Sequence, residues 1–228
     1  MLEEVEIECW HLDAIAGMPS IRRLQIYETC LSYSLEPLRG MQELRELYIR
    51  SYHSAKKGDL GAVLAALPAL EKLTFSYGSL MDGADYADVF SVPTVKEFVI
   101  KPDDAFSSYV QLSMSHIKDN PVLERLDLSG IEIENLDRPD ERPQPFGVYA
   151  EEFLSHFPGL KSLNVSGTKL DSLDFVRNMP ELAELDISDN YITDLTPLAG
   201  LPNLKKLVLR GNPVQNPDIL PDTVEMIR

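Results

Sequence analysis

Cysteine, histidine and basic residues are all scarce in this chain of 228 residues, and each shortage narrows what the chain can be. Two cysteines, Cys9 and Cys30, are too few for a disulfide framework or a structural zinc site. We expect both to be small buried side chains in a reducing compartment, and a Cys9–Cys30 bridge is the alternative. The four histidines come without an HxxxH or CxxC pattern, so no metal-ligand or nucleophile motif is present. The sequence therefore predicts no cofactor, no metal and no enzyme activity.

Long apolar runs and basic patches are missing as well. No run of about 18 apolar residues occurs, so the sequence predicts no membrane-spanning helix. The opening stretch MLEEVEIECW has four glutamates and no basic residue, which is unlike a signal peptide, and we expect a cytoplasmic protein. Lysine and arginine total 21 against 37 acidic residues, a formal net charge of −16. Such a chain repels phosphate backbones and anionic lipid headgroups, so we expect neither nucleic acid nor a membrane as its partner.

What the sequence does contain is one motif, repeated along its length. Apolar residues recur in the pattern apolar-x-x-apolar-x-apolar, with successive copies 19 to 37 residues apart. The last two apolar residues of each copy alternate with polar ones, which is the period of a strand with one buried face. After the strand, apolar residues come every three positions, which suits an irregular or 3₁₀-like return path. The nine copies begin at Leu2, Ile21, Leu44, Leu70, Val95, Leu123, Leu160, Leu182 and Leu204.

Strand and return together make one coil of a solenoid, because neither half can bury its apolar edge without the next coil. The motif resembles the leucine-rich repeat consensus L-x-x-L-x-L-x-x-N-x-L. The closest copies are Leu182-x-x-Leu185-x-Ile187-x-x-Asn190-x-Ile192 and Leu204-x-x-Leu207-x-Leu209-x-x-Asn212-x-Val214. The 22-residue copies at the C-terminal end resemble the internalin class of bacteria. The longer copies in the middle resemble the ribonuclease-inhibitor class, whose return paths are helical.

This resemblance implies an α/β fold with a single leucine-rich repeat domain over residues 1–228. It is expected to be a curved horseshoe, with about nine short parallel strands on the concave face and mixed helical and irregular returns on the convex side. A short final strand is expected through Val224 and Met226. The consensus asparagine, which bonds neighbouring backbone at each corner, is present at Asn190 and Asn212 and can be replaced by threonine at Thr29 and Thr168. Helices are expected at Leu60–Leu67, Ala84–Phe90, Val110–Lys118 and Tyr149–His156.

Two stretches depart from the regular pattern of the repeats. Residues 133–147, IENLDRPDERPQPFG, hold three prolines and six charges and predict a proline-rich inserted loop. This loop is either tolerated extra length or an arm that contacts a ligand. The first strand carries glutamates at positions 3, 4, 6 and 8. They form either an acidic binding patch or a row of charges that discourages another chain from pairing with an edge strand.

Residues between the leucines are expected to point away from the core in columns, because side chains alternate along a strand. Tyrosine and arginine, which dominate interface energetics, gather in the second to fourth copies. We expect Arg23, Tyr27, Tyr48, Arg50 and Tyr77 to bind a partner; the alternative is that strand propensity alone places tyrosines there.

The resemblance implies a non-enzymatic module that binds a protein or peptide on its concave face, and the acidic charge favours a basic partner. The alternative function is a recognition domain cut from a larger secreted or surface-anchored, internalin-like protein.

Overall fold

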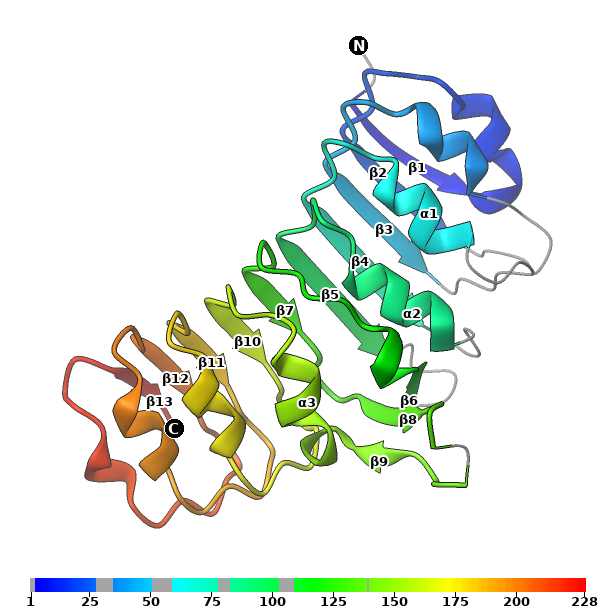
Figure 1. Ribbon diagram of the computed structural model, residues 1–228. Coiled ribbons are helices and arrows are strands. Elements are labelled where there is room, and N and C mark those ends of the chain that lie inside the picture. Colours follow the sequence, from blue (N-terminus) through cyan, green and yellow to red (C-terminus); the bar gives the residue numbers. More distant parts are fainter. Residues whose placement is uncertain (1–2, 28–34, 51–58, 78–82, 103–108, 139) are drawn as a thin grey trace.

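The computed structural model describes residues 3–27, 35–50, 59–77, 83–102, 109–138 and 140–228, and most of its strands lie in one ten-stranded sheet. Every pair of neighbouring strands in that sheet is parallel, and the strands follow one another in chain order along the molecule (Figure 1). The strands are β1 (Glu4–Glu8), β2 (Arg23–Tyr27), β3 (Glu46–Arg50), β4 (Lys72–Tyr77), β5 (Glu97–Pro102), β7 (Arg125–Asp127), β10 (Ser162–Asn164), β11 (Glu184–Asp186), β12 (Lys206–Val208) and β13 (Glu225–Ile227). The predicted open solenoid with a parallel sheet is confirmed. All nine predicted strands are present, and β13 lies at the expected final strand.

The return paths are short helices and 3₁₀ turns, and in Figure 1 the helices lie together along the stack of strands. Helices α1 (Asp59–Ala65), α2 (Gly83–Phe90) and α3 (Ala150–Leu154) match three of the four predicted helices. The 3₁₀ turns span Cys9–Ile15, Glu36–Gly40, Met114–His116, Phe146–Val148, Asp174–Asn178, Thr196–Gly200 and Pro217–Ile219. None of the described helices is long and apolar enough to cross a membrane.

The fourth predicted helix, Val110–Lys118, is wrong. This segment forms strand β6 (Tyr109–Leu112), followed by the 3₁₀ turn at Met114–His116. The reason is visible in the burial pattern: Val110, Leu112 and Met114 are buried two residues apart, which is the period of a strand.

The segment predicted as an inserted loop, residues 133–147, begins and ends in a second, three-stranded sheet. Strand β8 (Glu132–Asn135) pairs with β6 on one side and with β9 (Gln144–Pro145) on the other. Ile133 and Phe146 are fully buried at the two ends of the segment. Between them, Glu141 accepts a hydrogen bond of 3.1 Å from the hydroxyl of Tyr149 and lies 3.6 Å from the guanidinium of Arg138. The insertion is therefore anchored in the fold at both ends, while residues 137, 138 and 140–142 in its middle are exposed.

The core is a single cluster of aliphatic and aromatic side chains that runs through all the coils. The motif positions of each strand are buried, as in Leu126 and Leu185, because the strand turns that face toward its own return path. Phenylalanines fill the middle coils: the Phe90 ring lies 4.6 Å from that of Phe98 and 4.9 Å from that of Phe153. Both contacts are edge-to-face, the favoured geometry for aromatic rings.

The corners of the C-terminal coils are held by the predicted side chains. Asn190 donates to the carbonyl oxygens of Val165 and Ile187, each at 2.9 Å. Thr168 donates to the same Val165 carbonyl at 2.7 Å, so threonine does replace asparagine at that corner. Asn212 donates to the carbonyl of Ile187 at 2.7 Å. The corner role of Thr29 falls outside the described residues.

A candidate binding surface on the sheet

One side of the ten-stranded sheet faces away from the core, and we call it the sheet face. Its side chains stand in columns, because the strands pair in register. The middle column consists of the residues between the last two apolar positions of each copy, where the repeat alignment predicts it. It reads Glu6, Gln25, Tyr48, Thr74, Val99, Asp127, Asn164, Asp186, Val208 and Ile227.

The first column of the sheet face is a ladder of alternating charge. The guanidinium of Arg23 lies 3.5 Å from a carboxylate oxygen of Glu4 and 3.4 Å from one of Glu46. Further along, Lys72 lies 2.6 Å from Glu97. Exposed ion pairs of this kind contribute only about 0.2–1 kcal/mol each, so their main effect is to neutralise the column locally. The column reads Glu4, Arg23, Glu46, Lys72, Glu97, Arg125, Ser162, Glu184, Lys206 and Glu225.

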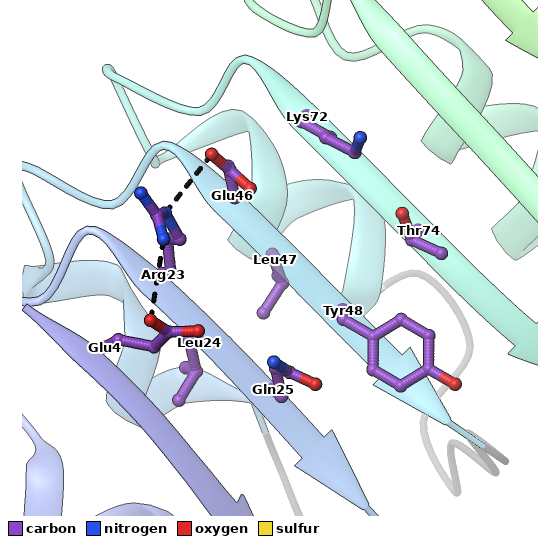
Figure 2. Close-up of a pocket in the computed structure, with 9 residues that line it drawn as sticks. All are labelled: Glu4, Arg23, Leu24, Gln25, Glu46, Leu47, Tyr48, Lys72 and Thr74. Carbon is purple, nitrogen blue, oxygen red and sulfur yellow. Dashed lines mark hydrogen bonds and ion pairs between the residues drawn. The ribbon is translucent and has the colours of Figure 1, made fainter.

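A groove of about 310 Å³ lies over strands β1 to β4 on this face (Figure 2). Figure 2 shows Arg23 bridging Glu4 and Glu46 at one end and the Tyr48 ring toward the other end. Gln25 and Thr74 lie on the strands to either side of Tyr48, so the ring projects above shorter neighbours. The groove is lined by Glu4, Arg23, Leu24, Gln25, Glu46, Leu47, Tyr48, Lys72 and Thr74.

Two of the predicted tyrosines contact each other next to this groove. The rings of Tyr27 and Tyr48 are 5.8 Å apart between centroids and tilted by 58°. The Tyr27 hydroxyl donates to the side-chain oxygen of Gln25 at 2.8 Å, which orients the ring. Burial raises the pKa of Tyr27, and the negative charge of Glu6 raises it further. The pair is thus a fixed, neutral aromatic surface bordered by a carboxylate.

The other predicted binding residues lie at different places. Arg23 sits at the start of β2, two side-chain positions along that face from Tyr27, and its charge is matched by two glutamates. Arg50 is exposed at the end of β3, where its positive charge acts on Tyr27. Tyr77 lies in β4 with its backbone opposite Pro102, and its side chain is outside the described part of the structure. The alternation of charge in the first column was not predicted, although the residue types at these positions of the repeat already alternate in sign.

Two smaller depressions accompany the sheet. One, of about 280 Å³, lies along the N-terminal ends of strands β3, β4, β5 and β7. Charges in it are paired, since Glu71 lies 3.3 Å from Arg45 and 3.4 Å from Lys96. The other, of about 120 Å³, lies over β10 to β12 and is lined by short polar residues such as Ser162 and Asn164. Unlike the groove over β1 to β4, neither depression has an aromatic ring among its lining residues.

The described residues contain no group of three or more histidine, cysteine, aspartate or glutamate side chains that could hold a metal ion. His156 contacts Asp119, with 2.8 Å between Nδ1 and the carboxylate oxygen. The side chains of Cys9 and Cys30, and all of His53, lie outside the described residues, so the predicted state of the cysteines stays a prediction.

Comparison with known proteins places two coils of this chain in a sequence family. The family described as leucine-rich repeats (2 copies) matches residues 180–221. These are the coils with the consensus asparagines Asn190 and Asn212. No curated protein matches the sequence significantly.

Solved structures resemble the fold over nearly the whole chain. The crystal structure of the internalin inlF from Listeria monocytogenes str. 4b F2365 superposes with a TM-score of 0.60 at 17% identity, covering 95% of this chain and 56% of that one. Internalin C2 (inlC2) of the same strain gives a TM-score of 0.54 at 20% identity, over 86% of this chain and 74% of that one. The structure of TLR13 in its complex with ssRNA13 superposes with a TM-score of 0.57 at 18% identity. The match covers 92% of this chain and 29% of TLR13. This chain thus spans little more than half of inlF, and these likenesses concern the fold.

Proposed function

We propose that this chain, which has the leucine-rich repeat fold throughout and matches the leucine-rich repeat family at residues 180–221, is a non-enzymatic module that binds a protein or peptide on the sheet face. A parallel sheet stacked coil on coil offers a rigid surface that needs no rearrangement on binding. The observation that carries the proposal is the Tyr27–Tyr48 pair beside the groove of about 310 Å³. Oriented aromatic side chains next to a depression are typical of interface hot spots.

The predicted binding residues take distinct roles in this proposal. Tyr48 and Tyr27 provide the apolar contact area, and Arg50 and Tyr77 extend the surface along the ends of β3 and β4. Arg23, which bridges Glu4 and Glu46, lines the end of the groove opposite the Tyr48 ring. We place the protein in the cytoplasm, in line with the sequence analysis.

A protein partner is favoured over RNA, although TLR13 is found with ssRNA13. The net charge of −16 opposes a phosphate backbone, and the cations of the groove, Arg23 and Lys72, already have carboxylate partners.

A second candidate function is a recognition domain of a larger secreted or surface-anchored protein of the internalin type. It is supported by the likeness to inlF over 95% of this chain, which spans only 56% of that protein.

The proposal is tested by affinity capture with the double variant Tyr48→Ala/Arg50→Ala. Its matched control is Val208→Ala/Arg210→Ala, which truncates a residue of the same middle column and the arginine two positions after it. Partners captured by the wild type are identified by mass spectrometry and their dissociation constants measured. We expect the first variant to weaken binding by about tenfold or more and the control to leave it within about twofold. Equal binding by both variants, or capture of RNA alone, contradicts the proposal.

A further inference from the structure

The carboxylates of β1 differ in what stands opposite them on β2: the first has a basic partner in the register, and the next two do not. In the first column Glu4 stands opposite Arg23 in the register and pairs with it. In the following positions of β1, Glu6 stands opposite Gln25 and Glu8 stands opposite Tyr27, neither of which carries a positive charge. Among the described residues Glu6 and Glu8 form no ion pair, and both are exposed. Against these two carboxylates stands the positive charge of Arg50, which acts on Tyr27 from the neighbouring strand β3, so this corner of the sheet face carries net negative charge.

The same corner carries the aromatic pair. Tyr27 is the register partner of Glu8, and its ring contacts that of Tyr48 one strand further on. Burial raises the pKa of Tyr27, and Glu6 raises it further while Arg50 lowers it, so both charged groups act on the Tyr27 hydroxyl. The register agrees, because Glu6 stands opposite Gln25, whose side chain accepts the Tyr27 hydrogen bond. Carboxylates next to the faces of tyrosine rings are the surroundings that stabilise a lysine ammonium or an arginine guanidinium.

Resting on the proposed function, we propose that the partner presents an extended segment with two basic residues two positions apart, whose side chains dock against Glu6, Glu8 and the Tyr27–Tyr48 pair. Side chains on one face of a strand recur every second residue, about 6.6 Å apart. Glu6 and Glu8 have that spacing along β1, and an extended basic segment lying along the strand matches it. Charge complementarity favours this occupant, because an acidic segment would be repelled by Glu6 and Glu8. The cations that line the groove, Arg23 and Lys72, are already paired with carboxylates.

The alternative role of these glutamates is to keep another chain from pairing with β1. The two roles differ in what removal of the carboxylates changes. A protective role predicts self-association of the variant with unchanged partner binding. A docking role predicts weaker binding of basic segments by a variant that stays monomeric.

The experiment uses two labelled peptides, one with the core Arg-Thr-Arg-Thr-Arg and one with glutamate in place of each arginine, in fluorescence anisotropy titrations. The protein variants are Glu6→Gln/Glu8→Gln and, as a control, Glu184→Gln/Glu225→Gln, which removes the same charge from the same face near its other end. Tyr48→Ala is titrated in parallel. Gel filtration and thermal unfolding establish that each variant is folded and in the same state as the wild type.

We expect the arginine peptide to bind the wild type in a salt-dependent manner and the glutamate peptide not to bind. Removing Glu6 and Glu8 should weaken binding on the order of tenfold, and removing Glu184 and Glu225 should change it less than about twofold. The inference is overturned by equal losses in the two double variants, by no loss in the first, by self-association as its only effect, or by no binding of the arginine peptide. If Tyr48→Ala still weakens capture of the natural partner in these cases, the proposed function stands without its basic anchor. If it does not, the proposed function fails as well.

Discussion

Asn190 is the side chain whose removal should most clearly reveal how the C-terminal coils are held together. It is almost completely buried, and its amide joins two neighbouring coils. The Nδ2 group donates to the carbonyls of Val165 and Ile187 at 2.9 Å each. The Oδ1 atom accepts from the backbone N–H groups of Thr168 at 3.1 Å and Leu170 at 2.9 Å. The Val165 and Ile187 carbonyls also accept hydrogen bonds from Thr168 and Asn212, so the two backbone N–H groups are the ones that depend on Asn190.

The cost of Asn190→Ala follows from those two N–H groups. Each buried donor left without an acceptor costs about 1–3 kcal/mol, so two of them cost about 2–6 kcal/mol. Water entering the space left by the amide would recover part of this, and we expect a loss of about 3 kcal/mol in the free energy of unfolding. Asn212 offers a graded control, because it is only half-buried and its Oδ1 accepts from one backbone N–H, that of Ile192 at 2.9 Å. Asn212→Ala should cost about 1–2 kcal/mol.

The assay is urea denaturation followed by circular dichroism, combined with amide hydrogen exchange. Exchange should accelerate most at Thr168 and Leu170 in the Asn190 variant, because a solenoid coil interacts only with its neighbours and opens locally. A loss below about 1 kcal/mol, equal losses in the two variants, or uniform acceleration along the chain would refute the reasoning.

Four further substitutions test other parts of the structure. Leu185→Ala, at a fully buried motif position, should lower the free energy of unfolding by about 2–5 kcal/mol in the same urea assay, and a cost below 1 kcal/mol would contradict the assigned core. Gly211 has a φ of +72°, and an added Cβ would lie 2.4 Å from Asp189 Oδ1, so Gly211→Ala should cost at least about 1 kcal/mol. Asp189 itself has a φ of 55°, so Asp189→Gly should be neutral or slightly stabilising. A Gly211→Ala variant that is more stable than the wild type, or a clearly destabilised Asp189→Gly variant, would be evidence against this backbone. Burial of Asp137 opposes its ionisation, but hydrogen bonds from Ser113 and Ser115 outweigh it and hold the pKa below the ordinary value. Its ionised form therefore stabilises the fold above the unfolded pKa, and this is lost as the pH falls through the folded pKa. Asp137→Asn should consequently lose less stability than the wild type between about pH 5 and pH 2 in urea titrations at each pH, and parallel curves would disprove the assignment.

Much of the fold could be predicted from the sequence because each coil repeats one requirement. The strand must bury two alternating residues, and fixing those residues fixes the register of the whole sheet. That is why the middle column, from Glu6 to Val208, was predicted residue by residue. The requirement is weaker in the return paths, where strand, 3₁₀ turn and helix can each bury an apolar edge. The helix predicted from Val110 to Lys118 is wrong for this reason. The strand that pairs with this segment, β8, lies at the start of the insertion, whose prolines and charged residues predict a loop.

The candidate site was predictable only in part. Residue type suggests which side chains could bind a partner, but their contacts with neighbouring side chains determine whether they are available to do so. Tyr27 and Tyr48 were identified as aromatic residues on neighbouring strands, and the structure brings their rings into contact. Arg23 was selected for the same reason as Arg50, but the register gives it two carboxylate neighbours. The geometry of an ion pair depends on side-chain conformations that no spacing rule specifies.

The alternating ladder also bears on how such a surface can be selective. A column in which each charge faces its opposite offers an approaching protein little net field, so it neither attracts nor repels strongly. Selectivity must then come from the places where the alternation stops. The alternation stops within the ladder at Ser162, between Arg125 and Glu184, and it has no counterpart beside the ladder at Glu6 and Glu8, which stand opposite uncharged residues. Only the second of these places has aromatic rings beside it, which is why the binding surface is proposed there and not over the shallow polar depression at β10 to β12.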